Sequence, residues 1–229
     1  MMLVDLHTHT TVSSGCSVMS PEGLIEAARG RGLHGVCVTD HYAIKGAEVT
    51  QALGRKMGYP VFRGVEARTD LGDMLVFGYH RDVPEGIRLD ALCRMVHQVG
   101  GLVFAAHPFH TGGGPSLVQA LRHRGLDLET GWNEIETLWA LDGVETLNGN
   151  VSEADNARAC VLAENLGVPG IGGSDAHSVG MVGSAATRFE GAIGTGRDLV
   201  AALRRARFEP LRLGASVQTR QRLWPGRPT

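Results

Sequence analysis

Short apolar runs alternate with helix-like patterns along most of the chain. The runs that predict strands are Met2–His7, Gly35–Asp40, Val61–Glu66, Met74–Tyr79, Leu102–His107, Gly143–Asn148 and Gly170–Asp175. Apolar residues at helical spacing predict helices at Pro21–Arg31, Ala47–Met57, Leu89–Val99, Pro115–Arg124, Glu153–Leu166 and Asp198–Arg207. This alternation predicts an α/β protein built from βα units around a mainly parallel sheet.

Residues at the ends of several predicted helices support this assignment. Ser20 precedes Pro21 and Ser152 precedes Glu153, and serine is a favoured helix N-cap. Gly32 and Gly167 follow two of the helices, where a left-handed backbone conformation commonly ends a helix. The helical pattern is therefore matched by the start and stop signals.

The chain has the size and composition of one globular barrel with a short tail. It contains 229 residues, 43% of them hydrophobic, with no linker or internal repeat. We therefore predict one domain over residues 1–211 and a basic tail over 212–229. The tail contains four arginines and no acidic residue. Its composition is typical of a frayed end, and a basic arm that holds an acidic substrate is the alternative.

Charge and cysteine content narrow the class of protein further. The formal net charge is −2, which argues against a strong basic field for nucleic acid or a membrane surface. The four cysteines form no CxxC pair, so reduced thiols are expected. The first residues show no signal-peptide pattern, and no apolar run is long enough to span a bilayer. We expect a soluble, cytoplasmic protein.

Polar residues with metal-binding side chains follow the predicted strands. They occur in the segments His7-Thr8-His9, Thr39-Asp40-His41, Glu66, His107-Pro108 and Asp175-Ala176-His177. The carboxyl ends of parallel barrel strands lie on one face, where active sites form. Residues i and i+2 of a strand also point the same way. The positions therefore predict a cluster of metal ligands on one face of the barrel.

The ordered set of motifs resembles the PHP family (polymerase and histidinol phosphatase). The motifs are His7-Thr8-His9-Thr10, Thr39-Asp40-His41, Gly64-Val65-Glu66, Ala106-His107-Pro108, Val144-Glu145-Thr146-Leu147-Asn148-Gly149 and Gly173-Ser174-Asp175-Ala176-His177. The resemblance implies a distorted (β/α)7 TIM-like barrel with its metal site at the C-terminal ends of the strands. It also implies two or three Mn, Fe or Zn ions and hydrolysis of phosphate esters.

The resemblance assigns ligands to the first two ions. His7, His9, Glu66 and Asp175 would surround one ion. Glu66 would bridge that ion to a second, which His107 would also hold.

The same resemblance assigns His41 and His177 to a third ion. Asp40 would be either a ligand or a residue that orients the imidazole beside it. Family members often carry an acid or histidine in the loop after HxHT, where this chain has Ser14. A neutral serine is a poor ligand, so the third site is expected to be weaker or completed by water.

A second departure from the family pattern lies at Asp73. Relatives commonly place histidine there, after Gly72. An aspartate can still ligate through oxygen, which favours a harder ion such as Mn. His80 is the competing donor, and it is expected to be a solvated loop residue.

Clustered divalent ions activate a bridging water and clamp the oxygens of a phosphoryl displacement. No protein nucleophile is then required, and the chain has no GxSxG motif. The predicted catalytic residues are Asp40, Glu66, Asp175 and His177.

Three residues near the ligands are candidates for binding substrate. Arg68 lies two residues after Glu66, His110 opens a glycine-rich loop before a predicted helix, and Asn148 lies at a strand end. The expected substrates are a phosphorylated small molecule, such as a phosphomonoester or nucleotide, or a short oligonucleotide end. No membrane or obligatory protein partner is expected.

Two other functions are compatible with part of this pattern. An amidohydrolase-like deacylase also begins with HxH, but many such enzymes use a carboxylated lysine, and Lys45 and Lys56 lie only in or before the second predicted helix. A non-catalytic metal-binding module, like the structural PHP domains of some polymerases, would be expected to have lost ligands that this chain keeps.

Overall fold

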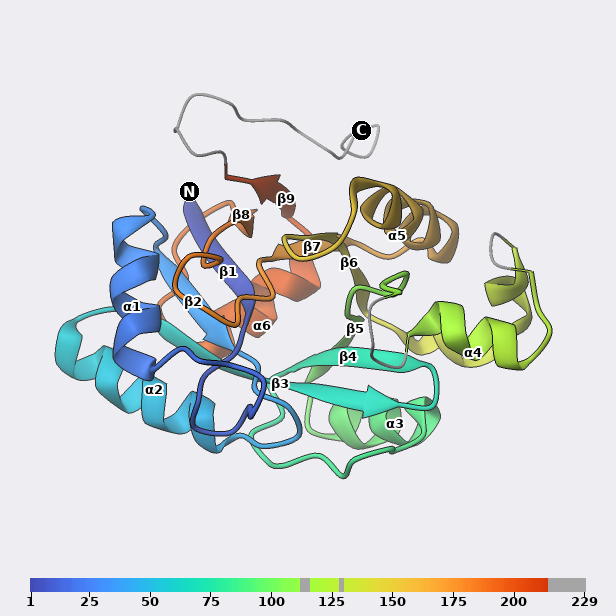
Figure 1. The fold of residues 1–229 in the computed structure, drawn as a ribbon, viewed down its shortest axis with the longest axis horizontal. Coiled ribbons are helices and arrows are strands. Elements are labelled where there is room, and N and C mark those ends of the chain that lie inside the picture. The colour runs from blue at the N-terminus through green and yellow to red at the C-terminus, as the bar shows by residue number, and fades with distance from the viewer. Residues whose placement is uncertain (112–115, 128–129, 214–229) are drawn as a thin grey trace.

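A nine-stranded mixed sheet curls into a nearly closed barrel that helices surround (Figure 1). The computed structural model describes residues 1–111, 116–127 and 130–213. The strands are β1 (Met2–Thr8), β2 (Gly35–Val38), β3 (Val61–Thr69), β4 (Gly72–Phe77), β5 (Leu102–Ala105), β6 (Gly143–Asn148), β7 (Gly170–Gly173), β8 (Ala185–Phe189) and β9 (Phe208–Arg212). Their order in the sheet is β7-β6-β5-β4-β3-β2-β1-β8-β9.

Six α-helices and two short 3-10 helices connect the described strands. They are α1 (Pro21–Gly30), α2 (Lys45–Met57), α3 (Leu89–Gln98), α4 (Leu117–His123), η1 (Gly131–Glu134), η2 (Glu136–Ala140), α5 (Glu153–Leu166) and α6 (Gly196–Arg205). The Ser20 hydroxyl accepts from Gly23 N–H and the Ser152 hydroxyl from Asp155 N–H, which confirms both predicted N-caps. Gly167 caps α5 with φ 67°. Among the described residues, no helix has the length and apolarity needed to cross a membrane.

The direction of β4 differs from the prediction of a mainly parallel sheet. Strands β1, β2 and β3 pair in parallel, as do β5, β6 and β7, whereas β4 is antiparallel to both β3 and β5. The connection from Thr69 to Gly72 is too short for a parallel crossover, so β3 and β4 form a hairpin. As a result Asp73, at the start of β4, lies opposite Arg68, and His80 is carried to the other end of the barrel.

Backbone hydrogen bonds join the first strand to the segment after β7. Asp175 N–H donates to the His7 carbonyl at 2.8 Å, and His9 N–H donates to the Ala176 carbonyl at 3.0 Å. At the other end of the strands, β8 pairs with the start of β1, and Gly172 N–H of β7 donates to the Thr187 hydroxyl of β8 at 2.8 Å. The barrel is thus closed by direct bonds at one end and by β8 at the other.

The sequence pattern missed β8 and β9. β9 contains Pro210 and lies at the edge of the sheet, where a missing N–H is tolerated. It ends at Arg212, the first residue of the predicted tail, so that residue belongs to the last strand. Residues 214–229 of the tail lie outside the described residues, as do residues 112–115 of the predicted glycine-rich loop.

Aliphatic and phenylalanine side chains hold the barrel rigid beneath the strand ends. Phe62, Phe77, Phe104 and Phe189 are buried in one cluster with Leu199 of α6. Each fully buried side chain of this size contributes about 1.5–3 kcal/mol to folding. A larger cluster packs helices α1 to α5 against the sheet. This packing fixes the strands whose ends carry the polar residues described next.

Candidate metal centre

His7 and His9 point into one buried pocket at the end of β1. The two Nε2 atoms lie 3.0 Å apart and both side chains are fully buried. Their spacing of two residues places both rings on one side of the strand. The pairing of β1 with β2 shifts register between Asp5 and Thr8, where the strand reaches the site.

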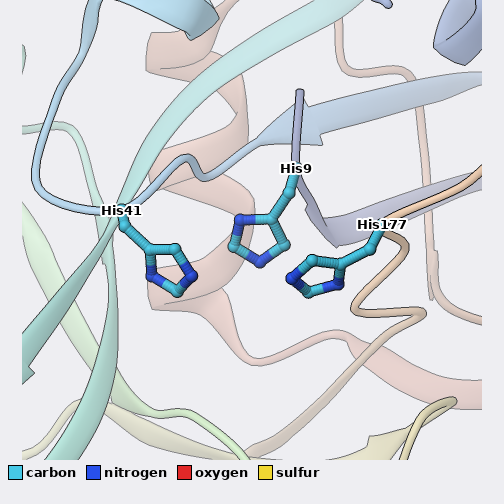
Figure 2. Close-up of side chains that lie close together, drawn as sticks. All are labelled: His9, His41 and His177. Carbon is cyan, nitrogen blue, oxygen red and sulfur yellow. The ribbon is translucent and has the colours of Figure 1, made fainter. Parts of the chain in front are cut away.

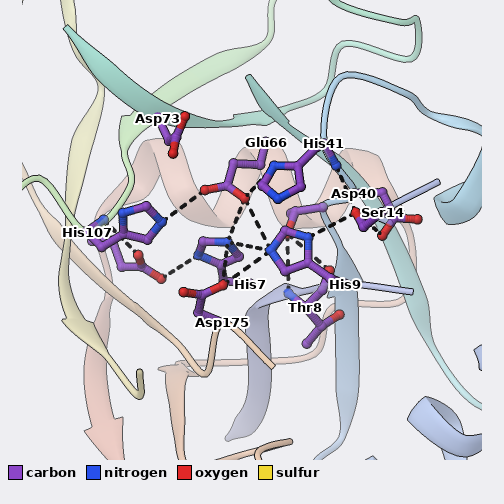
Figure 3. A network of polar contacts seen from close by, with 12 residues as sticks. His7, Thr8, His9, Ser14, Asp40, His41, Glu66, Asp73, His107 and Asp175 are labelled. Carbon is purple, nitrogen blue, oxygen red and sulfur yellow. Dashed lines mark hydrogen bonds and ion pairs between the residues drawn. The ribbon is translucent and has the colours of Figure 1, made fainter. Parts of the chain in front are cut away.

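Glu66 lies at the centre of the cluster (Figure 3). Its Oε2 atom is 3.3 Å from His7 Nε2, 3.2 Å from His9 Nε2 and 3.2 Å from His41 Nδ1. Its Oε1 atom is 3.0 Å from His107 Nε2. Although four imidazoles surround this carboxylate, the buried Oε2 atom has no hydrogen bond of acceptable geometry among the described residues.

The segment after β7 brings Asp175 and His177 to the same cluster. Asp175 Oδ1 is 3.4 Å from His7 Nε2 and 3.3 Å from His9 Nε2. Asp175 adopts φ 54°, a left-handed conformation that is uncommon outside glycine. The His177 ring stacks on His9 with centroids 4.4 Å apart, and His41 stacks on the other side of His9 at 4.7 Å (Figure 2).

In three of the rings an oxygen that can accept a hydrogen bond lies beside Nδ1. His7 Nδ1 lies 3.0 Å from Glu145 Oε1, and His177 Nδ1 lies 2.9 Å from the Asp175 carbonyl. His9 Nδ1 lies 3.3 Å from the Ser14 hydroxyl, whose own proton goes to Asp40. These oxygens can accept from Nδ1–H, so in the neutral rings each Nε2 would hold the lone pair that ligates a metal.

The donor set fits bound metal ions. Ligand atoms about 2.1 Å from one ion lie about 3.0–3.4 Å from each other, which is the spacing around Glu66 Oε2. Four overlapping groups have ligand atoms within 4.8 Å of one another: His7, His9 and Glu66; His9, His41 and His177; His7, His107 and Glu145; Glu66, Asp73 and His107. Imidazole and carboxylate together suit Mn, Fe and Zn.

The electrostatics of the cluster favour a cation. Burial opposes a charged ring, yet the charges of Glu145, Glu66 and Asp175 raise the pKa of His7 well above its usual value. Burial would raise the pKa of Glu66, but the surrounding histidines, His7 foremost, lower it well below the usual range. Glu66 therefore remains ionised in a buried site, where positive charge is required to balance it.

Asp73 joins the cluster beside His107. It is buried, and burial together with the charge of Glu66 raises its pKa to about 6. Arg68 Nε donates to Asp73 Oδ1 at 3.2 Å. The antiparallel direction of β4 brings this aspartate to the metal face, because the start of β4, where Asp73 lies, is paired with the end of β3.

Asp40 orients the cluster and does not belong to any of the four ligand groups. Its Oδ1 atom accepts from the Thr10 N–H at 2.6 Å and from the Ser14 hydroxyl at 2.9 Å. The Ser14 oxygen also accepts from the His41 N–H at 3.1 Å. Between the two alternatives for Asp40, the geometry favours the orienting role. Ser14 connects this carboxylate to His9 and His41.

Glu145 is a residue of the cluster to which the sequence motifs gave no role. Its Oε1 atom faces His7, and its Oε2 atom accepts from the His107 N–H at 2.9 Å. Gly173 of β7 packs directly against this pair, since a Cβ atom there would lie 2.5 Å from His7 Cβ and 2.9 Å from Glu145 Oε1. The available signal for Glu145 was a charged residue in an otherwise uncharged strand, and β6 is in fact buried along its whole length.

The candidate substrate-binding residues lie in different environments. Arg68 has a side chain 35% exposed beside Asp73. The His110 ring lies 5.6 Å from the His107 ring, at the edge of the cluster. Asn148 is fully buried, and its side-chain amide donates to Glu145 Oε2 at 2.9 Å. This position suits orientation of Glu145 and does not support the predicted direct contact with substrate. His80 is exposed, away from the cluster.

Comparisons with known proteins agree with this geometry. The PHP domain family model matches residues 5–127, and the PHP-associated model matches residues 153–208. An uncharacterized protein of Methanocaldococcus jannaschii is 27% identical over 172 residues, which cover 70% of this chain and 98% of that protein.

Two solved structures share the fold at low sequence identity. A two-domain protein of Bacteroides vulgatus, containing a predicted PHP-like metal-dependent phosphoesterase, has a TM-score of 0.66 at 18% identity, covering 91% of this chain and 64% of that one. Endonuclease Q, in complex with a 27-mer duplex carrying an abasic lesion, has a TM-score of 0.58 at 16% identity, covering 88% of this chain and 56% of that one.

Proposed function

This chain belongs to the PHP domain family, and on that premise we propose that it is a metal-dependent hydrolase of phosphate esters. The observation that carries the proposal is the convergence of four imidazoles on the two oxygens of Glu66. The proposed substrates are a small phosphomonoester, a nucleotide or a short oligonucleotide end. Among the structural relatives, Endonuclease Q holds a 27-mer duplex substrate with an abasic lesion at its active site, which supports the oligonucleotide alternative.

The proposed ligand sets follow the groups of the cluster. His7, His9, Glu66 and Asp175 would hold one ion, and Glu66 with His107 would hold a second, with Asp73 as a further donor. His41 and His177, beside His9, would hold a third. Such ions supply an activated water and neutralise charge on the phosphate.

The protein's own residues would orient and expose this centre. Glu145 and the Ser14–Asp40 pair fix the rings of His7 and His9 through their Nδ1 atoms. The side chains of His41 and His177 are each 25% exposed, whereas those of His7 and His9 are fully buried. A substrate would therefore approach from the side of His41 and His177.

Arg68 would contact the substrate phosphate at the edge of the cluster. Its partly exposed guanidinium already donates to Asp73, and it keeps further N–H donors for an anion. We expect Arg68→Ala to raise KM about tenfold or more while kcat changes by less than about threefold, because a charged hydrogen bond contributes about 1.5–3 kcal/mol. Steady-state kinetics on a phosphomonoester measure both constants.

Arg88→Ala is the matched control for this substitution. Arg88 also pairs with an aspartate, Asp90, at 3.0 Å, but its side chain is 72% exposed. Its removal should leave KM within about twofold of the unchanged protein. An Arg68→Ala enzyme with the KM of the Arg88→Ala enzyme would exclude the proposed contact.

The proposed function is tested by turnover of three phosphate esters. The metal content of the purified protein is measured by elemental analysis, and the metal-loaded protein is then assayed with p-nitrophenyl phosphate, its bis-ester and a short RNA. We expect hydrolysis of at least one of them. Failure on all three with the ions bound would reject the phosphoesterase assignment in favour of a deacylase or a non-catalytic metal-binding module.

A further inference from the structure

A second polar cavity lies near the start of β3. Its volume is about 590 Å³, and its lining includes Arg55 of α2, Arg63 of β3, His80 after β4 and Arg197 of α6. These residues come from four elements that are separated along the chain, so the fold itself brings the positive side chains together. None of them belongs to the metal-ligand groups of the described residues.

This cavity and the metal centre lie toward opposite ends of the barrel. Tyr59, Pro60 and Val61 line the cavity where β3 begins, and Glu66 lies five residues further along that strand. A strand rises about 3.3 Å per residue, so about 16 Å separates the two positions. His80 reaches this end because β4 runs antiparallel to β3. A ligand in this cavity would not touch the metal centre.

Positive charge in the cavity is only partly balanced. Glu48 is 3.7 Å from Arg63 and is its ion-pair partner among the described residues. The Nε atom of Arg63 is buried without a hydrogen-bond partner in the same part of the chain. Burial and the charge of Arg63 lower the pKa of His80. An uncompensated guanidinium N–H of this kind is costly unless a ligand accepts from it.

The first turn of α6 contributes Arg197 to the cavity. Gly196 and Arg197 begin this ten-residue helix and line the cavity. The Asp198 carboxylate accepts from the N–H groups of Gly194 and Thr195, so the positive charge here comes from the Arg197 side chain and not from the helix end. A neighbouring cavity of about 370 Å³ shares His80, Gly196 and Arg197 and adds Arg204, so the basic lining continues along α6.

We propose that this basic cavity, at a site separate from the metal centre, binds a phosphorylated small molecule. The phosphate groups of that molecule carry at least two negative charges. Three arginines around one cavity match a ligand with more than one negative charge. The volume lies within the range of about 300–1,000 Å³ that is typical of small-molecule sites. A nucleic acid would instead favour an extended basic surface, whereas here the arginines surround a hollow between α2, β3 and α6.

Pyrophosphate is the probe for this site. Titration of the metal-loaded protein, followed by calorimetry, is expected to show two binding events, one at the metal centre and one in the basic cavity. Arg197→Ala should weaken one event at least about fivefold, and Arg63→Ala with Arg197→Ala should abolish it. Turnover of p-nitrophenyl phosphate should remain within about twofold, because neither arginine lies in the metal centre.

Arg94→Ala is the control, since Arg94 is an exposed arginine of α3 outside this cavity. It should leave both binding events unchanged. The absence of any binding event that Arg197→Ala weakens would overturn the proposal, whether the unchanged protein shows one event or two. Binding of a single-stranded oligonucleotide through Arg63 and Arg197, with no pyrophosphate binding there, would also overturn it. Arg197 is exposed, so its single variant decides the matter even if the double variant fails to fold.

Discussion

Replacing Glu66 by glutamine is expected to reduce kcat by about 10³-fold, or ~4 kcal/mol of transition-state stabilisation, without unfolding the protein. Both oxygens of this carboxylate face imidazole nitrogens, and Oε2 lies where three of them converge. An amide keeps the shape of the side chain but removes its negative charge and one acceptor oxygen. The variant should therefore lose bound metal, since Glu66 is the proposed ligand shared by two ions. Kinetics and elemental analysis of the same sample measure both effects.

Glu164→Gln provides the matched control for this change. Glu164 is exposed on α5, and the same substitution there should leave kcat and metal content unchanged. Asp175→Asn tests the same centre from the segment after β7, because the Asp175 Oδ1 atom faces both His7 and His9. An unchanged kcat in metal-replete Glu66→Gln protein would remove Glu66 from the reaction and would contradict the proposed centre.

Removal of bound metal is expected to lower Tm by about 8–16 °C. A ligand present at about 1,000 times its Kd stabilises the folded state by about 4.1 kcal/mol. Each kcal/mol corresponds to about 2–4 °C for a chain of this size. Without an ion, the buried carboxylates Glu66, Glu145 and Asp175 lie close together with only imidazoles to balance their charge. Thermal unfolding before and after treatment with a chelator measures the shift.

Restoring the ion is the necessary control for that experiment. Addition of Mn, Fe or Zn after the chelator has been removed should recover the original Tm. The Glu66→Gln protein should show a smaller shift than the unchanged protein, because part of its ligand set has been removed. Equal Tm values for the metal-loaded and metal-free forms of the unchanged protein would show that the cluster does not bind an ion in the folded state.

The clustering of the histidines could be predicted because the carboxyl ends of parallel strands lie on one face of a barrel. His7, His9, His41 and Asp175 lie at or just after the carboxyl end of a strand, and the structure brings them into one cluster with Glu66, which lies within β3 because that strand continues to Thr69. That inference needs only the order of strands and the rule that parallel strands end together. It does not need the detailed packing of the barrel.

Asp73, at the start of β4, and two residues of β6 were harder to assign. Asp73 reaches the site only because β4 is antiparallel, which the hydrophobic pattern does not report. Glu145 and Asn148 lie on β6 and are hydrogen-bonded to each other, and Glu145 is the one in contact with His7. The β8–β9 pair depends on contacts with β1 and β7 that are distant in sequence. Long-range pairing of this kind leaves little local signal.

The bonds between the end of β1 and the segment after β7 have a consequence for how the protein folds. His7 and Asp175 are connected through the backbone as well as through their side chains. The ligand set is consequently incomplete until the polypeptide has formed nearly all of its strands, and its closing contact is among the most non-local in the molecule. Such topology slows folding. An ion bound between His7 and Asp175 would join the end of β1 to the segment after β7 only once both are in place. Enzyme activity should therefore appear in the last stage of folding.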